Sequence, residues 1–247
     1  MLDDKKDIEK IMPGITKEID SIMTYDKTDA FKRVIPSLIR RGIENTNLSM
    51  FDEKTKRELI NAAGREYFKK GRVDEAIHAY KIVNNKEKLA EISDYYMEIG
   101  LLGKCVDILV DIDDKERLIK AGDKCLRETR IPEAIKAFIK AGERSKLVKV
   151  GAECLEKGKT DYAIQIFAAL DDKDMLIKTG ELCFKNNELE EAATAFNLAG
   201  EKEKLNLVGD SYLREDALKE ALFVYELSGN TTMIKFIKEN FDKELDK

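Results

Sequence analysis

The chain of 247 residues contains no tryptophan, only three prolines and one histidine, and no long apolar run. A membrane-spanning helix needs about 18 or more consecutive apolar residues, and no stretch of this sequence approaches that length. Residues 1–6 also lack the apolar run of a signal peptide. We therefore expect a cytoplasmic protein without a membrane span.

Sequence motifs for catalysis and for phosphate binding are missing too. The sequence has no glycine-rich phosphate loop, no His-Glu-x-x-His pair and no Gly-x-Ser-x-Gly turn. It also lacks the alternating runs, rich in valine, threonine and tyrosine, that would indicate β-strands. These absences predict an all-α protein that is not an enzyme and that binds no cofactor.

The sequence does contain one unit that occurs six times over residues 60–232, at a spacing of 29 residues. The small-residue column of this repeat is Gly64, Ser93, Gly122, Gly151, Gly180 and Gly209. Four residues before it stands a large aliphatic residue, twelve after it alanine or Cys105, and sixteen after it an aromatic residue or Leu109. A fixed period of about 20 to 50 residues is typical of solenoids, whose stacked units bury one continuous core.

Each unit is predicted to be a pair of helices. In residues 117–145, apolar residues recur at helical spacing as far as position 126, and the pattern breaks at Thr129. The Thr129 position holds glycine in three other units and Asn or Asp in two more, which are residues that tolerate a left-handed helix end. Pro132 then suits the first turn of a second helix. Two helices of about 11 to 13 residues with short turns would pack antiparallel.

The glycine and alanine columns predict tight contact inside each pair. Glycine within a helix costs about 1 kcal/mol relative to alanine, so its repetition needs a structural reason. We expect the backbones of the paired helices to approach closely there. A larger side chain at Gly151 or Ala163 would then separate them.

This order of large aliphatic, glycine, aromatic, alanine, aromatic and small residues resembles the tetratricopeptide repeat, over about 175 residues. The period is 29 residues rather than about 34, and the tryptophan and the closing proline are absent. The shortened unit, with Gly142-Glu143 or Asp171-Asp172 after its second helix, is similar to the α-solenoids of vesicle-coat and intraflagellar-transport proteins. The resemblance implies a right-handed α-solenoid of six antiparallel helix pairs that serves as a scaffold or adaptor.

Residues 1–50 lie outside the repeat and are predicted to be helical. Their apolar residues fall on one face of a helix over residues 4–23 and of a second helix over residues 28–43, which we expect Pro36 to interrupt. One interpretation is a cap on the first unit, because such arrays need caps for solubility. The other interpretation is a docking or dimerisation arm.

The remaining boundaries follow from the register. The repeats would occupy residues 51–232, with a long first helix that begins near Asp52. Residues 233–247 keep the apolar positions of a first helix, but no second helix follows, so we expect a C-terminal capping helix. The only histidine, His78, lies in a column of mostly polar residues, which predicts a surface residue rather than a base or a metal ligand.

Three of the four cysteines, Cys125, Cys154 and Cys183, occupy one column. They could form a metal or redox ladder, or they could fill core space where other units have tyrosine. Equivalent residues of adjacent units would be about 8–10 Å apart, beyond the roughly 7 Å that a disulfide spans, and no zinc-ligand spacing is present. We expect buried free thiols, no metal, and a reducing compartment.

A candidate partner surface lies in the three central units. There the leading leucine is followed by an aliphatic residue and then a lysine: Ile119 and Lys120, Val148 and Lys149, Ile177 and Lys178. The family resemblance implies that first helices line the inner, concave surface. Such a stripe would suit an acidic peptide or helix with apolar anchors. The alternative is that the aliphatic column packs against the neighbouring first helix and that the lysines are only solvated.

Charge separates the remaining classes of function. Charged residues make up 38% of the chain, the formal net charge is −5, and both signs are interspersed, as on a solvated helical surface. A nucleic-acid-binding helical array would carry a basic stripe, and a module that binds a small regulatory ligand would need a site that the sequence does not supply. We therefore expect a scaffold or adaptor that binds another protein on its concave face.

Overall fold

The computed structural model describes residues 27–245, and this part of the chain contains fourteen helices and no strand. The expected all-α fold is confirmed, whereas the helix expected over residues 4–23 lies outside the described residues. None of the described helices is both long enough and apolar enough to span a bilayer. The chain divides into two compact units, Met1–Leu101 and Leu102–Lys247, and each is described by itself.

The first unit contains α2 (Lys27–Arg41), α3 (Glu53–Lys69), α4 (Val73–Ile82) and α5 (Lys86–Glu98). Helix α2 continues through Pro36, so the expected interruption there is wrong. Pro36 is exposed, whereas Ile35, Leu38 and Ile39 are buried. The proline therefore lies on the solvent side, and the apolar face that packs in the core stays continuous.

The loop between α2 and α3 covers apolar surface of the first helix pair. Ile43 and Leu48 pack against a buried cluster that contains Ile60 and Val83. The carboxylate of Asp52 accepts a hydrogen bond from the backbone N–H of Thr55 at 2.8 Å. This N-cap satisfies one of the free donors at the helix start and confirms that α3 begins directly after Asp52.

The second unit contains ten helices. They are α6 (Leu102–Ile112), α7 (Lys115–Arg127), α8 (Ile131–Ala141), α9 (Arg144–Glu156), α10 (Thr160–Ala169), α11 (Lys173–Lys185), α12 (Leu189–Ala199), α13 (Lys202–Arg214), α14 (Leu218–Ser228) and α15 (Thr231–Leu245). Helices α7, α9, α11 and α13 span 13 residues each, and the even-numbered helices span 10 or 11. These lengths are close to the roughly 11 to 13 residues expected for the two helices of each pair.

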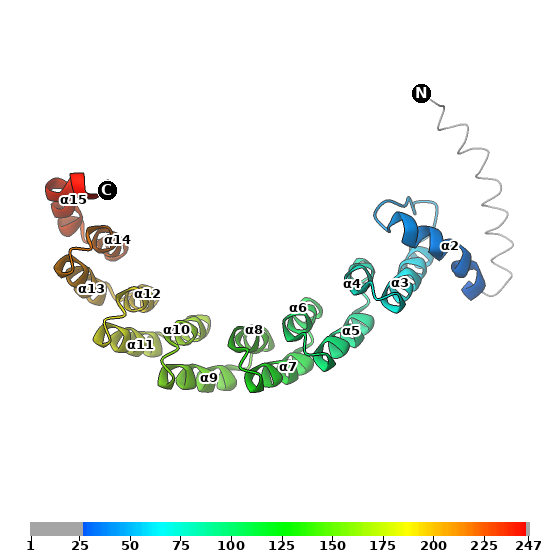
Figure 1. The fold of residues 1–247 in the computed structure, drawn as a ribbon, viewed down its shortest axis with the longest axis horizontal. Helices are drawn as coiled ribbons and strands as arrows, with labels where there is room; N and C mark the ends of the chain where they lie inside the picture. The colour runs from blue at the N-terminus through cyan, green and yellow to red at the C-terminus, as the bar shows by residue number, and fades with distance from the viewer. Residues whose placement is uncertain (1–26, 246–247) are drawn as a thin grey trace, which may run out of the picture. The chain divides into compact units, whose positions relative to one another are not determined.

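Helices of the second unit form two layers. Each helix packs against the next one, and the even-numbered helices also pack against one another, α6 on α8, α8 on α10, α10 on α12 and α12 on α14. Neighbouring odd-numbered helices of this unit have no comparable backbone contact. Within this unit, Figure 1 shows α8, α10, α12 and α14 on the inner side of the bend. This differs from the arrangement that the family resemblance implies, in which first helices line the inner surface.

An aromatic ring is the physical reason for the glycine column. A Cβ atom built on Gly122 would lie 2.6 Å from Cε1 of Phe138, and one on Gly180 would lie 2.6 Å from Cε1 of Phe196. The same close approach to the ring sixteen residues later recurs at Gly64, Gly151 and Gly209. The close contact that was expected between two backbones is therefore a contact between a helix backbone and a ring.

Left-handed residues end the helices at two positions in each period. Thr129 has a φ of 59° and Gly142 a φ of 79°. The next residue closes each helix end, because Arg130 N–H donates to the Cys125 carbonyl at 2.8 Å and Glu143 N–H donates to the Phe138 carbonyl at 3.0 Å. The left-handed residues are Gly71, Gly100, Thr129, Gly158, Asn187 and Asp216 within the pairs, and Asn84, Asp113, Gly142, Asp171, Gly200 and Gly229 between them. The predicted left-handed position after the first helix is therefore confirmed.

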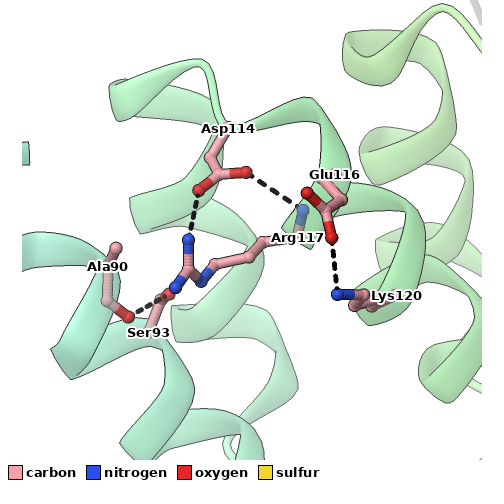
Figure 2. A network of polar contacts seen from close by, with 6 residues as sticks. All are labelled: Ala90, Ser93, Asp114, Glu116, Arg117 and Lys120. Atoms are coloured by element: carbon pink, nitrogen blue, oxygen red, sulfur yellow. Dashed lines mark hydrogen bonds and ion pairs between the residues drawn. The ribbon is translucent and has the colours of Figure 1, made fainter. Parts of the chain in front are cut away.

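Polar residues at the turns also start the next helix. Figure 2 shows Asp114, whose carboxylate accepts from the backbone N–H of Arg117 at 3.0 Å and from its guanidinium at 2.8 Å. Burial raises the pKa of Asp114, but these hydrogen bonds outweigh burial, so its net pKa lies below the ordinary value.

In the first unit, Ser93 stands in the glycine column, and its buried hydroxyl donates to the Ala90 carbonyl at 2.7 Å.

Candidate functional site

The aliphatic residues of the predicted stripe occupy equivalent positions on α7, α9 and α11. Val148 is 39% exposed, whereas Ile119 and Ile177 are half-buried. Of the three aliphatic residues, only Val148 is therefore exposed. The other two lie partly under neighbouring groups, which favours a packing role for them.

Polar members of the same column show what it faces. In α13 the equivalent residue is Asn206, whose side-chain oxygen accepts from Asn230 Nδ2 at 3.0 Å, in the turn before α15. In the first unit, Asn61 accepts from Asn85 Nδ2 at 2.6 Å, in the turn before α5. At both ends of the repeat, this column thus faces the turn that leads to the next pair.

The three lysines of the stripe are exposed. Lys120 forms an ion pair with Glu116 at 2.7 Å (Figure 2), and this hydrogen bond lowers the pKa of the Glu116 carboxyl. Lys149 and Lys178 form no hydrogen bond or ion pair with any residue of 34–241, the range whose side chains are described. They are therefore available to carboxylates of another molecule.

A different lysine column links neighbouring first helices. Lys146 on α9 lies 2.6 Å from Asp123 on α7, and its ammonium group lies 5.5 Å from the centre of the Phe138 ring. The same arrangement joins α13 to α11 through Lys204, Glu181 and Phe196. These lysines thus have carboxylate partners on the neighbouring odd-numbered helix, although such exposed ion pairs add only about 0–1 kcal/mol each.

A hollow of about 480 Å³ lies over α6, α8 and α10 of the second unit. Its lining consists of Val110, Pro132, Ile135, Lys136, Ile139, Lys140 and Gln165. Ile139 is 41% exposed, and the lining holds two lysines but no carboxylate. Lys136 and Lys140 pair with Asp107 at 2.6 Å and with Asp113 at 3.3 Å, residues that lie outside the lining.

The exposed surface of the next even-numbered helices carries little charge. Beyond the first two residues of α10 and α12, the exposed positions are Gln165, Ala169, Thr194, Asn197 and Leu198. Leu198 is 47% exposed, and Phe223 on α14 is 61% exposed. Val148, Leu182 and Leu207 are exposed on odd-numbered helices of the same unit, so the exposure of apolar side chains is not confined to one layer.

Sequence reasoning missed the hollow, although one column signals it. The position five residues after the buried alanine holds Lys81, Asn197 and Glu226 in three units. In three consecutive units it holds Val110, Ile139 and Ala168 instead. Apolar residues at an otherwise polar surface position could have identified this place, but the spacing alone does not show that side chains leave a hollow beside them.

The cysteine column is buried, as predicted, and its thiols are free. Burial raises the pKa of the Cys125 thiol to about 11, and burial together with nearby Glu188 raises that of Cys183 to about 12. Within residues 34–241, no group of three or more His, Cys, Asp or Glu side chains could hold a metal ion. The column is therefore chemically suited to packing.

A thiol reagent should modify Cys125, Cys154 and Cys183 slowly in the native protein and completely in denaturant. Reaction requires the thiolate, and both burial and the raised pKa values suppress it at pH 8. The measurement is mass spectrometry after timed labelling. Rapid native labelling of all three, or a stoichiometric metal in the purified protein, would contradict the packing role.

His78 is a surface residue, as predicted. Its side chain is 51% exposed, and Nε2 lies 2.8 Å from a carboxylate oxygen of Glu44. Both belong to the first unit, and no other described histidine exists to complete a catalytic or metal-binding set. The pair is a local contact between the α2–α3 loop and α4.

The chain matches neither a known protein family nor a curated protein.

Proposed function

We propose that this protein is a non-enzymatic scaffold or adaptor that binds other proteins. In this proposal residues 51–232 form a right-handed solenoid of six helix pairs, residues 1–50 serve as a cap or a docking arm, and residues 233–247 form the C-terminal cap. The observation that carries the proposal is the contrast between buried and exposed apolar groups. Rings and glycines pack closely inside the pairs, yet large apolar side chains stay exposed on helices of both layers, among them Val148 on α9 and Phe223 on α14.

The proposed partner is a protein segment with acidic and apolar residues, in extended or helical form. Val148, Lys149 and Lys178 support a docking surface on the odd-numbered layer, because all three are exposed. Adjacent helices repeat the lysine at one unit's spacing, so a partner segment that crosses α7, α9 and α11 would meet one lysine on each helix. Groove or surface recognition of this kind uses apolar anchors for affinity and charge for register.

Affinity purification of the tagged full chain from its source cell tests the function. We expect a small set of proteins to be retained at physiological salt, and at least one of them to bind the purified chain with saturable stoichiometry. Retention of nucleic acid that is lost as salt rises, or of a bound metabolite without any protein, would overturn the scaffold assignment.

Charge reversal should identify the stripe as a binding surface. The triple variant Lys120→Glu, Lys149→Glu, Lys178→Glu should bind the purified partner roughly tenfold or more weakly at low salt, because the lysines would attract acidic groups. The fold should persist, since exposed charge changes have small effects on stability. Isothermal titration and a thermal melt measure the two quantities.

A matched control carries the same change in net charge. Lys173→Glu, Lys202→Glu and Lys219→Glu alter exposed lysines in the first turns of α11, α13 and α14, where glutamate is favourable. This variant should bind as the wild type does. If the stripe variant stays folded and binds equally well, the stripe is not the site.

A further inference from the structure

The geometry points to a docking surface that is longer than the predicted stripe and that changes in character along its length. Lys149 on α9 and Lys178 on α11 form its basic half, Leu207 on α13 and Phe236 on α15 form its apolar half, and together they are the extended stripe. Its partner is an extended protein segment with acidic residues in one half and large apolar residues in the other. This inference rests on the proposed scaffold function and specifies the partner of that same surface.

Leu207 and Phe236 occupy the position of the stripe lysines. They follow Lys178 at one and two repeat intervals of 29 residues. The core contacts of the residue after each of them repeat at the same interval, in two clusters with matching members. These are Val208 with Ala192 and Phe196, and Ile237 with Ala221 and Tyr225. Helices α13 and α15 therefore pack in the same orientation, with Leu207 and Phe236 on the solvent side.

Apolar side chains replace charge in this half of the extended stripe. In the first five repeats the position holds Ala62, Glu91, Lys120, Lys149 and Lys178. Leu207 is 52% exposed and Phe236 46%, and the Phe236 ring meets Phe241 edge to face, with the ring centres 6.0 Å apart. Single exposed apolar residues are ordinary on a protein surface. Two of them at consecutive positions of one column, however, offer a partner a pair of anchors at a fixed spacing.

The lysines of the basic half are available to a partner. Lys149 and Lys178 are exposed, and neither pairs with any residue of 34–241, the range whose side chains are described. Glu153 and Glu181 lie one turn further along α9 and α11, but each pairs with another lysine, at 3.6 and 2.5 Å. Asp174, one turn before Lys178, forms no ion pair with it. Acidic residues of a partner would therefore meet free ammonium groups, whereas a basic segment would meet like charges.

The position of the layer determines the conformation of the partner. Within residues 102–245, the odd-numbered helices lie on the outer side of the bend (Figure 1). A straight helix laid across that side would touch only the helices near its middle, whereas an extended segment can follow the bend. Packed helix axes are about 10 Å apart, so the path from α9 to α15 spans about 30 Å. An extended chain advances about 3.3 Å per residue, so roughly nine or ten residues cover that path.

Synthetic peptides of about 14 residues, long enough to span the extended stripe, test the inference on the full chain. Two of them join a block of glutamate and serine to a block of leucine, phenylalanine and serine, one in each order along the peptide. The matched control has the same composition, with acidic and apolar residues alternating. Fluorescence anisotropy at about 150 mM salt measures binding. We expect one block order to bind at least tenfold more tightly than the alternating control.

Substitutions in the apolar half locate the anchors. The double variant Leu207→Gln, Phe236→Gln should weaken binding of the better block peptide at least tenfold. The matched control, Leu198→Gln, Phe223→Gln, removes two exposed apolar residues of the even-numbered layer and should change the affinity by less than twofold. All four side chains are exposed, so a thermal melt within about 3 °C of the wild type should verify each fold.

Substitutions in the basic half show that charge acts through the acidic block. Lys149→Gln, Lys178→Gln should weaken the block peptide at least tenfold but leave unchanged the binding of a peptide with serine in place of glutamate. The matched control, Lys173→Gln, Lys202→Gln, alters exposed lysines in the first turns of α11 and α13 and should have less than a twofold effect.

Three results would overturn the extended stripe. The first is equal binding of block and alternating peptides, or no binding of either block order below about 1 mM. The second is a full chain that sediments as a dimer and becomes a monomer with Leu207→Gln, Phe236→Gln, because a second copy then covers the apolar half. The third is a protein partner from the source cell that requires the lysines but not Leu207 and Phe236. In each case the scaffold function stands, whereas a chain that retains no protein partner at all refutes that function itself.

Discussion

Ala163→Glu should lower the free energy of unfolding by about 3–5 kcal/mol, the range expected for an unpaired charge placed in a packed interior. Ala163 lies in α10 and is 0% exposed. A glutamate there would either bury an unpaired carboxylate or displace the packed side chains around it. Urea denaturation followed by circular dichroism gives the change in stability.

Ala152→Glu is the matched control, because it adds the same side chain to the neighbouring helix. Ala152 lies in α9 and is exposed, so its substitution should change stability by less than about 0.5 kcal/mol. If Ala163→Glu melts within a degree or two of the wild type, the alignment of the units that places Ala163 in the core is wrong.

Gly122→Ser should be the second severe change, with a loss of about 2–3 kcal/mol. A Cβ atom at this position would lie 2.6 Å from the Phe138 ring, so the ring or the helix has to move. Serine is a better helix former than glycine, but that gain is only about 0.5 kcal/mol and cannot offset the clash. Thermal and urea unfolding measure the difference.

The sequence itself offers the compensating change. The second of the six sequence repeats has Ser93 in the glycine column and Leu109 in the aromatic column. Phe138→Leu should therefore rescue part of the loss in Gly122→Ser, and the double variant should be more stable than the sum of the single effects by about 1 kcal/mol or more. Additive energies in this double-mutant cycle would show that the ring does not explain the glycine.

The helix ends could be predicted from the sequence because their chemistry is local. Glycine, asparagine and aspartate tolerate positive φ, and these residues fill the Thr129 column and the turn columns around it. The outcome is a left-handed residue at each such position from Gly71 to Gly229. The start of α3 after Asp52 was predictable for the same reason, since one side chain and one backbone N–H make the cap.

Features that depend on how helices meet could not be predicted in this way. The spacing placed Gly122 and Phe138 in one pair but did not show that the ring lies over the glycine. Likewise, Lys146 and Asp123 are 23 residues apart, and only the packing of α7 and α9 makes them partners. Helix α2 continues through Pro36. The local expectation that proline interrupts a helix therefore does not hold here, where the proline faces solvent.

The candidate site likewise has features that the sequence could predict and features that it could not. The exposure of the three stripe lysines could be predicted, because lysine side chains are rarely buried. Half-burial of Ile119 and Ile177 depends on how the helices pack, which no residue pattern describes. The hollow beside Ile139 arises from three helices together, so it appears only once α6, α8 and α10 are placed.

The more extensive contacts in the second unit join helices that are at most two apart along the chain, and this has a kinetic consequence. Forming such contacts requires closing only short loops, for which the loss of chain entropy is small, and proteins built from local contacts fold quickly. Within residues 102–245, no contact of this extent joins helices that are distant along the chain. We therefore expect unfolding to begin at the ends and to reach the interior pairs last.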